Sequence, residues 1–192
     1  SVGDAVMTVS ITDSTPTAIL FTAGNADGIF AIATSGAVTI ADTTNLDFET
    51  MASYTLTIVA YDASSSDVAD ITISITNAND APTLATAQAD ETATEDTAYS
   101  VDVSGNFADV DVGDTLTYTA TGMPSTMTMS TAGVLSGTPL NADVGTSTVV
   151  VTATDGTASI TDTFDVVIAN TNDAPTLATA QADETATEDT AY

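Results

Sequence analysis

Lysine, arginine, histidine, cysteine and tryptophan are all absent from this 192-residue sequence. Without lysine or arginine, the phosphate contacts of nucleic-acid binding and the attraction to anionic membranes are excluded. Without histidine or cysteine, Ser-His and Cys-His nucleophiles, His/Cys zinc sites and disulfides are excluded. No apolar run reaches 18 residues and no signal-peptide pattern is visible, so we expect no transmembrane helix.

The sequence contains 27 acidic residues and has a formal net charge of −27. Because no side chain is cationic, each carboxylate must face water, accept hydrogen bonds from neutral donors or bind a metal. A charge of this size also opposes the compact state, and divalent cations would relieve the repulsion. The chain is not disordered in composition, since 43% of its residues are hydrophobic. Two cores of modest size are therefore expected.

One stretch of the sequence occurs twice. Residues 79–99 read NDAPTLATAQADETATEDTAY, and residues 172–192 repeat them letter for letter. Such self-similarity indicates a repeat protein. Tyr99 is followed by Ser100-Val101, and the sequence starts with Ser1-Val2. We therefore expect these residues to form one period of a homopolymeric array or filament, with further copies arranged end to end; a two-domain fragment is the alternative.

The hydrophobic pattern predicts an all-β fold. In residues 54–61, Tyr54, Leu56 and Ile58 alternate with threonines, which is typical of half-buried antiparallel strands. No helical period is sustained anywhere. Short strands separated by Gly, Asn and Asp turns predict tandem seven-stranded Greek-key β-sandwiches rather than one larger barrel. The expected strands lie within 5–12, 18–23, 28–33, 37–41, 54–61 and 71–76, and then 99–103, 116–120, 126–130, 146–154 and 163–170.

The duplication predicts where the domains meet. We expect one sandwich in residues 1–78, a second in 79–171, and a linker with the first strand of the next unit in 172–192. Residues 172–192 cannot complete the domain that precedes them. We therefore expect the first strand of the first domain to be supplied by the preceding unit, since an unpaired edge would otherwise invite pairing.

Acidic residues gather in three short segments. These are the Asn-Asp-Ala-Pro segments at Asn79 and Asn172, the Leu-Asp-Phe-Glu segment at Leu46, and the Asp-x-Asp segment at Asp109. Calcium takes six to eight oxygen ligands from carboxylates, amides and carbonyls, which this composition supplies. A simple turn or a solvated loop is the alternative for each. Paired carboxylates could also serve a glycosidase, but the sequence has no tryptophan and no cleft-forming insertion.

Longer motifs carry a family resemblance. The first half resembles a cadherin repeat in Phe30-x-Ile32, Leu46-Asp47-Phe48-Glu49, the strand at 54–62 and the Asn77-x-Asn79-Asp80 segment. The second half resembles the dystroglycan-type cadherin-like (Ig-like) domains of long bacterial repeat adhesins. Its matching segments are residues 107–118, 133–139 and 152–156.

This resemblance implies Ca²⁺ at the linkers. At the middle junction it implies ligands from Asp47, Glu49, Asn79, Asp80, Asp109, Asp111 and Asp155. Asn77 stands where cadherins usually have Asp, so one charge is missing. The first-strand Glu of cadherins corresponds to Glu95, and to Glu188 for the next unit. At the junction after Asn172 and Asp173, the next unit offers only Asp13 and Asp62 as ligands, so fewer or more weakly bound ions are expected there.

These observations favour a non-enzymatic structural role. We expect a module of a calcium-rigidified extracellular fibre or adhesin stalk at the surface of a bacterium, which binds further copies of itself. The alternative is an adhesin module that binds a carbohydrate or a surface. An enzyme would have only bare carboxylates for its chemistry.

Overall fold

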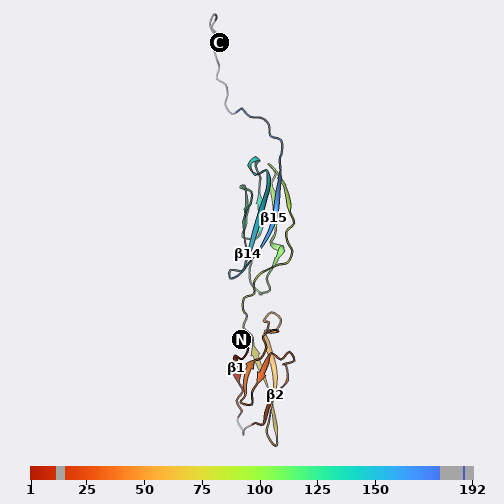
Figure 1. Cartoon of the computed structure of the whole chain (residues 1–192), viewed down its shortest axis with the longest axis vertical. Coiled ribbons are helices and arrows are strands. Elements are labelled where there is room, and N and C mark those ends of the chain that lie inside the picture. The colour runs from red at the N-terminus through yellow and green to blue at the C-terminus, as the bar shows by residue number, and fades with distance from the viewer. Residues whose placement is uncertain (12–15, 178–187, 189–192) are drawn as a thin grey trace. The chain divides into compact units, whose positions relative to one another are not determined.

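The computed structural model describes residues 1–11, 16–177 and 188. The chain forms two compact units, and each contains β-strands joined by turns (Figure 1). Unit 1 comprises residues 1–83, 108–116 and 154–160. Unit 2 comprises residues 84–107, 117–153 and 161–192. The predicted all-β fold is confirmed, and the described helices are two short 3₁₀ turns, at Ser104–Asn106 and Asn141–Asp143.

Unit 1 packs two three-stranded sheets against each other. One sheet has the order β1-β4-β3, and the other has the order β2-β5-β6. All described pairings between these strands are antiparallel. The strand bounds are β1 Ala5–Thr8, β2 Ala18–Ala23, β3 Phe30–Ile32, β4 Ala37–Ile40, β5 Ser53–Tyr61 and β6 Ser66–Ser74.

The core of unit 1 follows from the alternation along β5. Tyr54, Leu56 and Ile58 are buried there, as the sequence pattern predicted. Leu56 is fully buried and packs in a cluster with residues of the facing sheet, including Phe30. The rings of Phe30 and Tyr54 meet edge to face, with centroids 5.3 Å apart. Apolar side chains from both sheets thus hold the unit together.

Unit 2 has a four-stranded sheet, β11-β14-β15-β8, and a three-stranded sheet, β12-β13-β9. β14 and β15 are neighbours in the larger sheet (Figure 1). A small sheet, β10-β7, completes the pairing. The strand bounds are β7 Thr83–Leu84, β8 Glu91–Thr94, β9 Tyr99–Asp102, β10 Phe107–Ala108, β11 Thr117–Thr121, β12 Met127–Met129, β13 Val134–Gly137, β14 Gly145–Thr154 and β15 Ser159–Ala169.

Six strands of unit 2 repeat the topology of unit 1. The sheet β1-β4-β3 corresponds to β9-β13-β12, and β2-β5-β6 corresponds to β11-β14-β15. The last strand of each unit is longer than the sequence indicated: β6 begins at Ser66 and β15 at Ser159. Each forms a tight hairpin with the preceding strand, so pairing starts before the clean alternation does. Only unit 2 has a fourth strand in this sheet, β8, which pairs with β15 in parallel.

In both units, a glycine directly after an edge strand, β2 or β11, lets the chain approach the backbone of the neighbouring strand closely. Gly24 follows β2 with φ +81°, and a Cβ there would lie 2.0 Å from the carbonyl oxygen of Thr55. Gly122 follows β11 with φ +73°, and its Cβ would lie 2.1 Å from the carbonyl oxygen of Thr148. A side chain at either position would meet a rigid backbone rather than a movable side chain.

Substituting Gly24 tests this close approach. We expect Gly24→Ala to destabilise unit 1 by more than the roughly 1–2 kcal/mol that left-handed strain costs, because the β5 backbone must also move. Gly28→Ala is the matched control, since its φ is +69° and nothing lies within 4 Å of its Cβ position. Urea unfolding of both variants measures the difference. Equal losses of stability would show that the contact with Thr55 carries no energy.

Candidate metal centre

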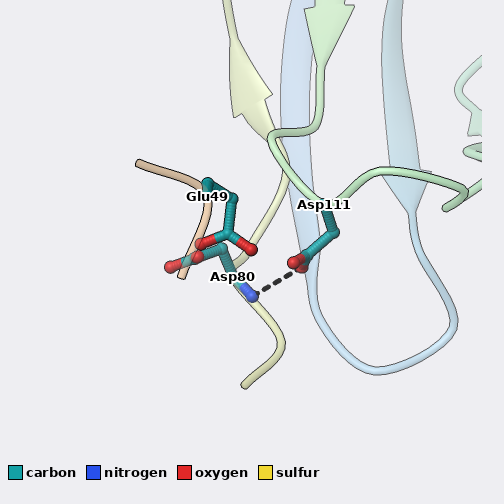
Figure 2. Close-up of side chains that lie close together, drawn as sticks. All are labelled: Glu49, Asp80 and Asp111. Atoms are coloured by element: carbon teal, nitrogen blue, oxygen red, sulfur yellow. Dashed lines mark hydrogen bonds between the residues drawn. The ribbon is translucent and has the colours of Figure 1, made fainter. Parts of the chain in front are cut away.

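Three carboxylates converge in unit 1. Glu49, Asp80 and Asp111 each offer an oxygen, and these oxygens lie within 4.8 Å of one another. Figure 2 shows the Glu49 and Asp80 side chains side by side, facing Asp111. Glu49 precedes β5, Asp80 lies in the extended segment after β6, and Asp111 lies in the loop after β10. Residues distant in the sequence therefore meet at one point, as expected for a cation site.

Neutral donors fix the position of Asp111 within this cluster. Its carboxylate accepts a hydrogen bond from Asn77 Nδ2 at 2.8 Å. It also accepts one from the main-chain N–H of Asp80 at 2.8 Å, which Figure 2 shows as a dashed line. The Asp111 side chain is 6% exposed. These hydrogen bonds, that of Asn77 foremost, hold the pKa of Asp111 below its usual value. Asp111 thus stays ionised at the centre of the cluster.

The Asp-x-Asp loop adds a second, overlapping cluster. Asp109, Asp111 and Asp114 also offer oxygens within 4.8 Å of one another. Asp109 Oδ1 accepts the main-chain N–H of Asp111 at 3.0 Å, which turns both carboxylates inward. Asp111 belongs to both clusters, so the two form one continuous acidic centre.

Neighbouring turns hold further predicted ligands beside this centre. Asp155 accepts hydrogen bonds from Thr157 N at 2.6 Å, Ala158 N at 2.7 Å and Asn79 Nδ2 at 3.0 Å. Those main-chain donors lower the pKa of Asp155. Asp47 closes a turn by accepting the N–H of Glu49 at 2.9 Å, and its pKa is also lowered, chiefly by the Thr50 hydroxyl. Both carboxylates are ionised and held in place.

Two oxygens of the centre are buried without a donor. Among the described residues, Glu49 Oε1 and Asp109 Oδ2 are buried acceptors with no hydrogen-bond partner. Desolvation raises the pKa of Glu49, and the nearby carboxylates of Asp111 and Asp47 add to the rise. Desolvation raises the pKa of Asp114 too, with the charges of Asp111, Asp109 and Asp155 contributing. Unpartnered buried carboxylate oxygens are costly, and a hard cation would satisfy both, so these residues fit a calcium ion.

A smaller carboxylate cluster lies in unit 2. Glu95, Asp96 and Asp173 offer oxygens within 4.8 Å of one another. Glu95 is 2% exposed and accepts the N–H of Thr171 at 3.0 Å. Asp96 has φ +59°, a left-handed conformation that turns the chain directly after Glu95. Asn141 Nδ2 donates to Asp173 at 2.7 Å, so an amide stands beside this cluster.

The remaining predicted ligands lie apart from these clusters. Asp62 accepts hydrogen bonds from Ser64 and Ser65 in the turn between β5 and β6, and belongs to none of the described carboxylate clusters. Asn172 donates to the main-chain oxygen of Asp173 at 3.2 Å. Glu188 is exposed. Asp13 lies outside the described residues, as does most of 172–192.

Two clustered residues were absent from the predicted ligands. Asp114 stands three residues after Asp111, and its place in the Asp-x-Asp-x-x-Asp run was the signal that could have identified it. Asp96 follows Glu95 directly, and adjacent side chains in an extended segment point to opposite faces. The left-handed turn at Asp96 removes that alternation, and no pattern in the sequence indicates such a turn.

The segment 140–143 of unit 2 has a different use. It stands where unit 1 has Leu46 to Glu49, but Asp143 points into its own unit and is 9% exposed. Its carboxylate accepts hydrogen bonds from Thr126 Oγ1 at 2.7 Å, Ser125 Oγ at 2.7 Å and Leu140 N at 3.1 Å. These bonds, led by that of Thr126, lower the pKa of Asp143 to about 2. Asp143 is therefore a structural carboxylate.

Comparison with known proteins supports the fold. The family model He_PIG, described as "Putative Ig domain", matches residues 81–169. Human protocadherin-24 EC1-2 is similar with a TM-score of 0.67 and 16% identity, covering 89% of this chain and 91% of that chain. Chicken VE-cadherin EC1-2 has a TM-score of 0.57 and 19% identity, and the match covers 86% of this chain and 89% of that chain. Protocadherin gammaB7 EC3-6, a cis-dimer structure, has a TM-score of 0.66 and 19% identity, and the match covers 91% of this chain and 44% of that chain.

These similarities show the fold of the chain. Residues 81–169 match an Ig-like domain, and the chain is structurally similar to pairs of cadherin EC repeats, so its architecture is that of Ig-like and cadherin-like β-sandwiches. None of the curated proteins matches its sequence. Within residues 1–11, 16–177 and 188, no helix has the length and hydrophobicity to cross a bilayer.

Acid titration tests the role of Asp143. Its folded pKa of about 2 lies below the ordinary value of 3.8, so the unfolded chain binds more protons between these two values. The stability that Asp143 contributes should be complete above about pH 5 and lost as the pH falls through about 2. We expect Asp143→Asn to be less stable than the native chain at pH 6. The difference in stability between the two should disappear near pH 2. Denaturant unfolding at both pH values measures it.

The matched control for that experiment is Asp102→Asn. Asp102 is exposed and accepts the N–H of Ser104 at 2.9 Å. The substitution Asp102→Asn therefore removes one negative charge from unit 2 and breaks no buried hydrogen-bond network. A pH response of Asp143→Asn no larger than that of Asp102→Asn would contradict the assigned role.

Proposed function

We propose that this chain is a structural module of an extracellular tandem-repeat fibre or adhesin stalk, and that calcium makes the module rigid. The observation that carries this proposal is the acidic centre of unit 1, where Glu49, Asp80 and Asp111 converge and two buried oxygens lack a donor. No lysine, arginine or histidine is available to neutralise these charges. A bound cation is the remaining means of neutralisation.

Calcium suits this centre better than magnesium does. Magnesium keeps several of its waters and takes one or two protein carboxylates, whereas calcium accepts six to eight oxygens in flexible geometry. Glu49, Asp80, Asp109, Asp111 and Asp114 already bring five carboxylates into the overlapping clusters. Asn77, Asn79, Asp47 and Asp155 would orient or complete the ligand set. When bound, the ion would supply charge neutralisation and cross-linking, and no reaction.

Rigidity would follow from where the ligands lie in the sequence. Glu49 and Asp80 belong to the first stretch of unit 1, whereas Asp111 and Asp155 belong to the segments 108–116 and 154–160. Both of those segments continue directly into strands of unit 2, β11 and β15. An ion that binds all of them would fasten these segments to unit 1. Removal of the ion would leave mutually repelling carboxylates and a flexible connection.

The extended context of the module is also part of the proposal. We assign the second unit to the dystroglycan-type cadherin-like domains of bacterial surface adhesins, on the motifs quoted above and the Ig-domain match to residues 81–169. The duplicated stretch supports end-to-end association with further copies of the chain. A similar fold, protocadherin gammaB7, forms a cis-dimer, which supports self-association as a use of this architecture. The role is structural rather than enzymatic, as is typical of Ig-like and cadherin-like domains.

Thermal unfolding with and without calcium tests the proposal. A ligand present at 100 times its Kd stabilises the folded state by about 2.7 kcal/mol, so the melting temperature of unit 1 should rise by several degrees in millimolar calcium. Asp111→Asn should weaken the apparent calcium affinity about tenfold or more, because it removes the carboxylate common to both clusters of unit 1.

Asp27→Asn is the matched control, because Asp27 is exposed in the turn after β2 and outside the described clusters. It removes one charge and should leave the calcium response unchanged. A wild-type melting curve that is the same in calcium and in chelator would refute the proposal. An equal response to magnesium would argue against a calcium-selective centre.

A further inference from the structure

In unit 2, the last strand is covered along its outer edge by a short parallel strand. β8 pairs with β15, and Glu91, Thr92, Ala93 and Thr94 stand opposite Val166, Val167, Ile168 and Ala169. Ala93 is 7% exposed, so this strand also contributes to the core. The residues before β8 extend the cover, because Gln88 N donates to the buried Asp162 at 2.7 Å. The edge of β15 is thus closed.

The corresponding edge in unit 1 is open. Strand β6 occupies the place of β15, at the end of the order β2-β5-β6, and no described strand pairs with its outer side. Ile75 N donates to Ala52 O at 2.8 Å, toward β5. Because donors alternate along a strand, the N–H groups of Ser74 and Thr76 point to the open side. An unpaired edge of this kind is a template for another strand.

A hollow lies beside the start of β6. Its volume is about 320 Å³, and its lining includes Ile58, Ala60 and Ala69 of the β5–β6 hairpin together with Ile11 and Pro16. Ala69 pairs with Ile58, whose side chain faces the core, yet Ala69 is exposed. Its counterpart in unit 2, 93 residues later, is Asp162, which is 7% exposed beneath Gln88. The first half of β6 therefore lacks the segment that covers β15.

The same spacing aligns the two edges residue by residue. Counted back from Asp80 and Asp173, Ile73 corresponds to Val166 and Ile75 to Ile168. Ile73 and Val166 are both buried. Ile75 is half-buried where Ile168 is 2% exposed. At Ile75, unit 1 therefore leaves partly exposed a position that is buried in unit 2.

The sequence contains one more copy of the strand that fits this edge. The β8 residues Glu-Thr-Ala-Thr recur at 184–187, within the exact repeat of 79–99. We propose that residues 184–187 of a second copy of this chain add to β6 of unit 1 as a parallel strand. Glu184, Thr185, Ala186 and Thr187 would stand opposite Ile73, Ser74, Ile75 and Thr76.

This inference deepens the self-association in the proposed function and gives it a direction. The donor is the segment 184–187 of one copy and the acceptor is strand β6 of another, so the contact is heterologous and forms a filament where it does not close into a ring. It also joins the filament to the acidic centre. Glu188 would take the place that Glu95 has beside Thr171, which brings a further carboxylate near Asp80, 93 residues before Asp173. Calcium would offset that repulsion.

A peptide with the sequence of residues 172–192 tests the proposal on the full chain. In saturating calcium, we expect the labelled peptide to bind, to shorten assemblies seen by light scattering, and to protect the Ser74 and Thr76 amides from hydrogen exchange. An Ala186→Asp peptide should bind about tenfold or more weakly, because it buries an unpaired charge. A Thr185→Asp peptide carries the same added charge at the position equivalent to the exposed Thr92, and should stay within about twofold.

A change on the acceptor gives an independent reading. Ser74→Pro removes an N–H that points to the open edge, and proline is tolerated at edge strands. We expect it to abolish peptide binding while the melting temperature in chelator stays near that of the native chain. Equal binding of the two charged peptides, or protection at amides other than those of β6, would overturn the proposal. Protection of β6 in a monomer at every concentration would also overturn it, because the chain's own segment would then be the occupant.

The calcium response of the same sample separates this inference from the proposed function. Stabilisation by calcium without peptide binding would overturn strand addition and leave the calcium centre standing. Peptide binding with no stabilisation by calcium would leave strand addition standing and overturn the calcium centre.

Discussion

The fold depends on carboxylates that have no cationic side chain to pair with. A protein with 27 acidic residues and no lysine, arginine or histidine must place every negative charge against water, an N–H or O–H donor, or an ion. The structure uses the second solution repeatedly in its turns. Asp47, Asp62 and Asp155 each accept main-chain N–H groups two and three residues later. In these three turns, main-chain N–H groups of nearby residues therefore stabilise the negative charge.

In the acidic centre of unit 1, hydrogen bonds from nearby donors do not satisfy every carboxylate oxygen. Asp111 is satisfied by Asn77 and the Asp80 N–H, but Glu49 Oε1 and Asp109 Oδ2 are buried without donors. Carboxylates forced together in this way repel one another and favour an ion between them. The acidic centre is therefore the part of the structure most sensitive to cations. In the proposed stalk, calcium bound there would stiffen each module.

The two units show how one sandwich can be finished in two ways. Their sheets correspond strand for strand, yet β15 is covered by β8 and β6 is not covered by any described strand. An open, partly apolar edge is a liability for an isolated domain. In the proposed repeat array it would be a means of joining copies, because the sequence of the covering strand recurs at 184–187. The duplicated stretch would then act as linker, ion ligand and first strand together.

Most of the fold could be predicted from local pattern. Alternation in 54–61 placed Tyr54, Leu56 and Ile58 in the core, and Gly, Asn and Asp marked the turns, because strand and turn preferences are properties of neighbouring residues. The starts of β6 and β15 could not be predicted, because hairpin pairing sets them. The acidic segments could be found from composition, but only the family resemblance grouped Glu49 with Asp111 and Asn79 with Asp155. No local pattern could do so, because both meetings depend on contacts between residues far apart in the sequence.

The sequence by itself therefore determined the all-β class, the repeat and the chemistry available to the site, since these follow from residue types and their spacing. The tertiary structure decided which carboxylate oxygens of the described residues lie close together, that Asp114 and Asp96 are among them, and that Asp143 is not. It also decided which sheet edge stays open. Convergence in space and the direction of a strand's free N–H groups arise only when sheets have paired, and no local pattern encodes them.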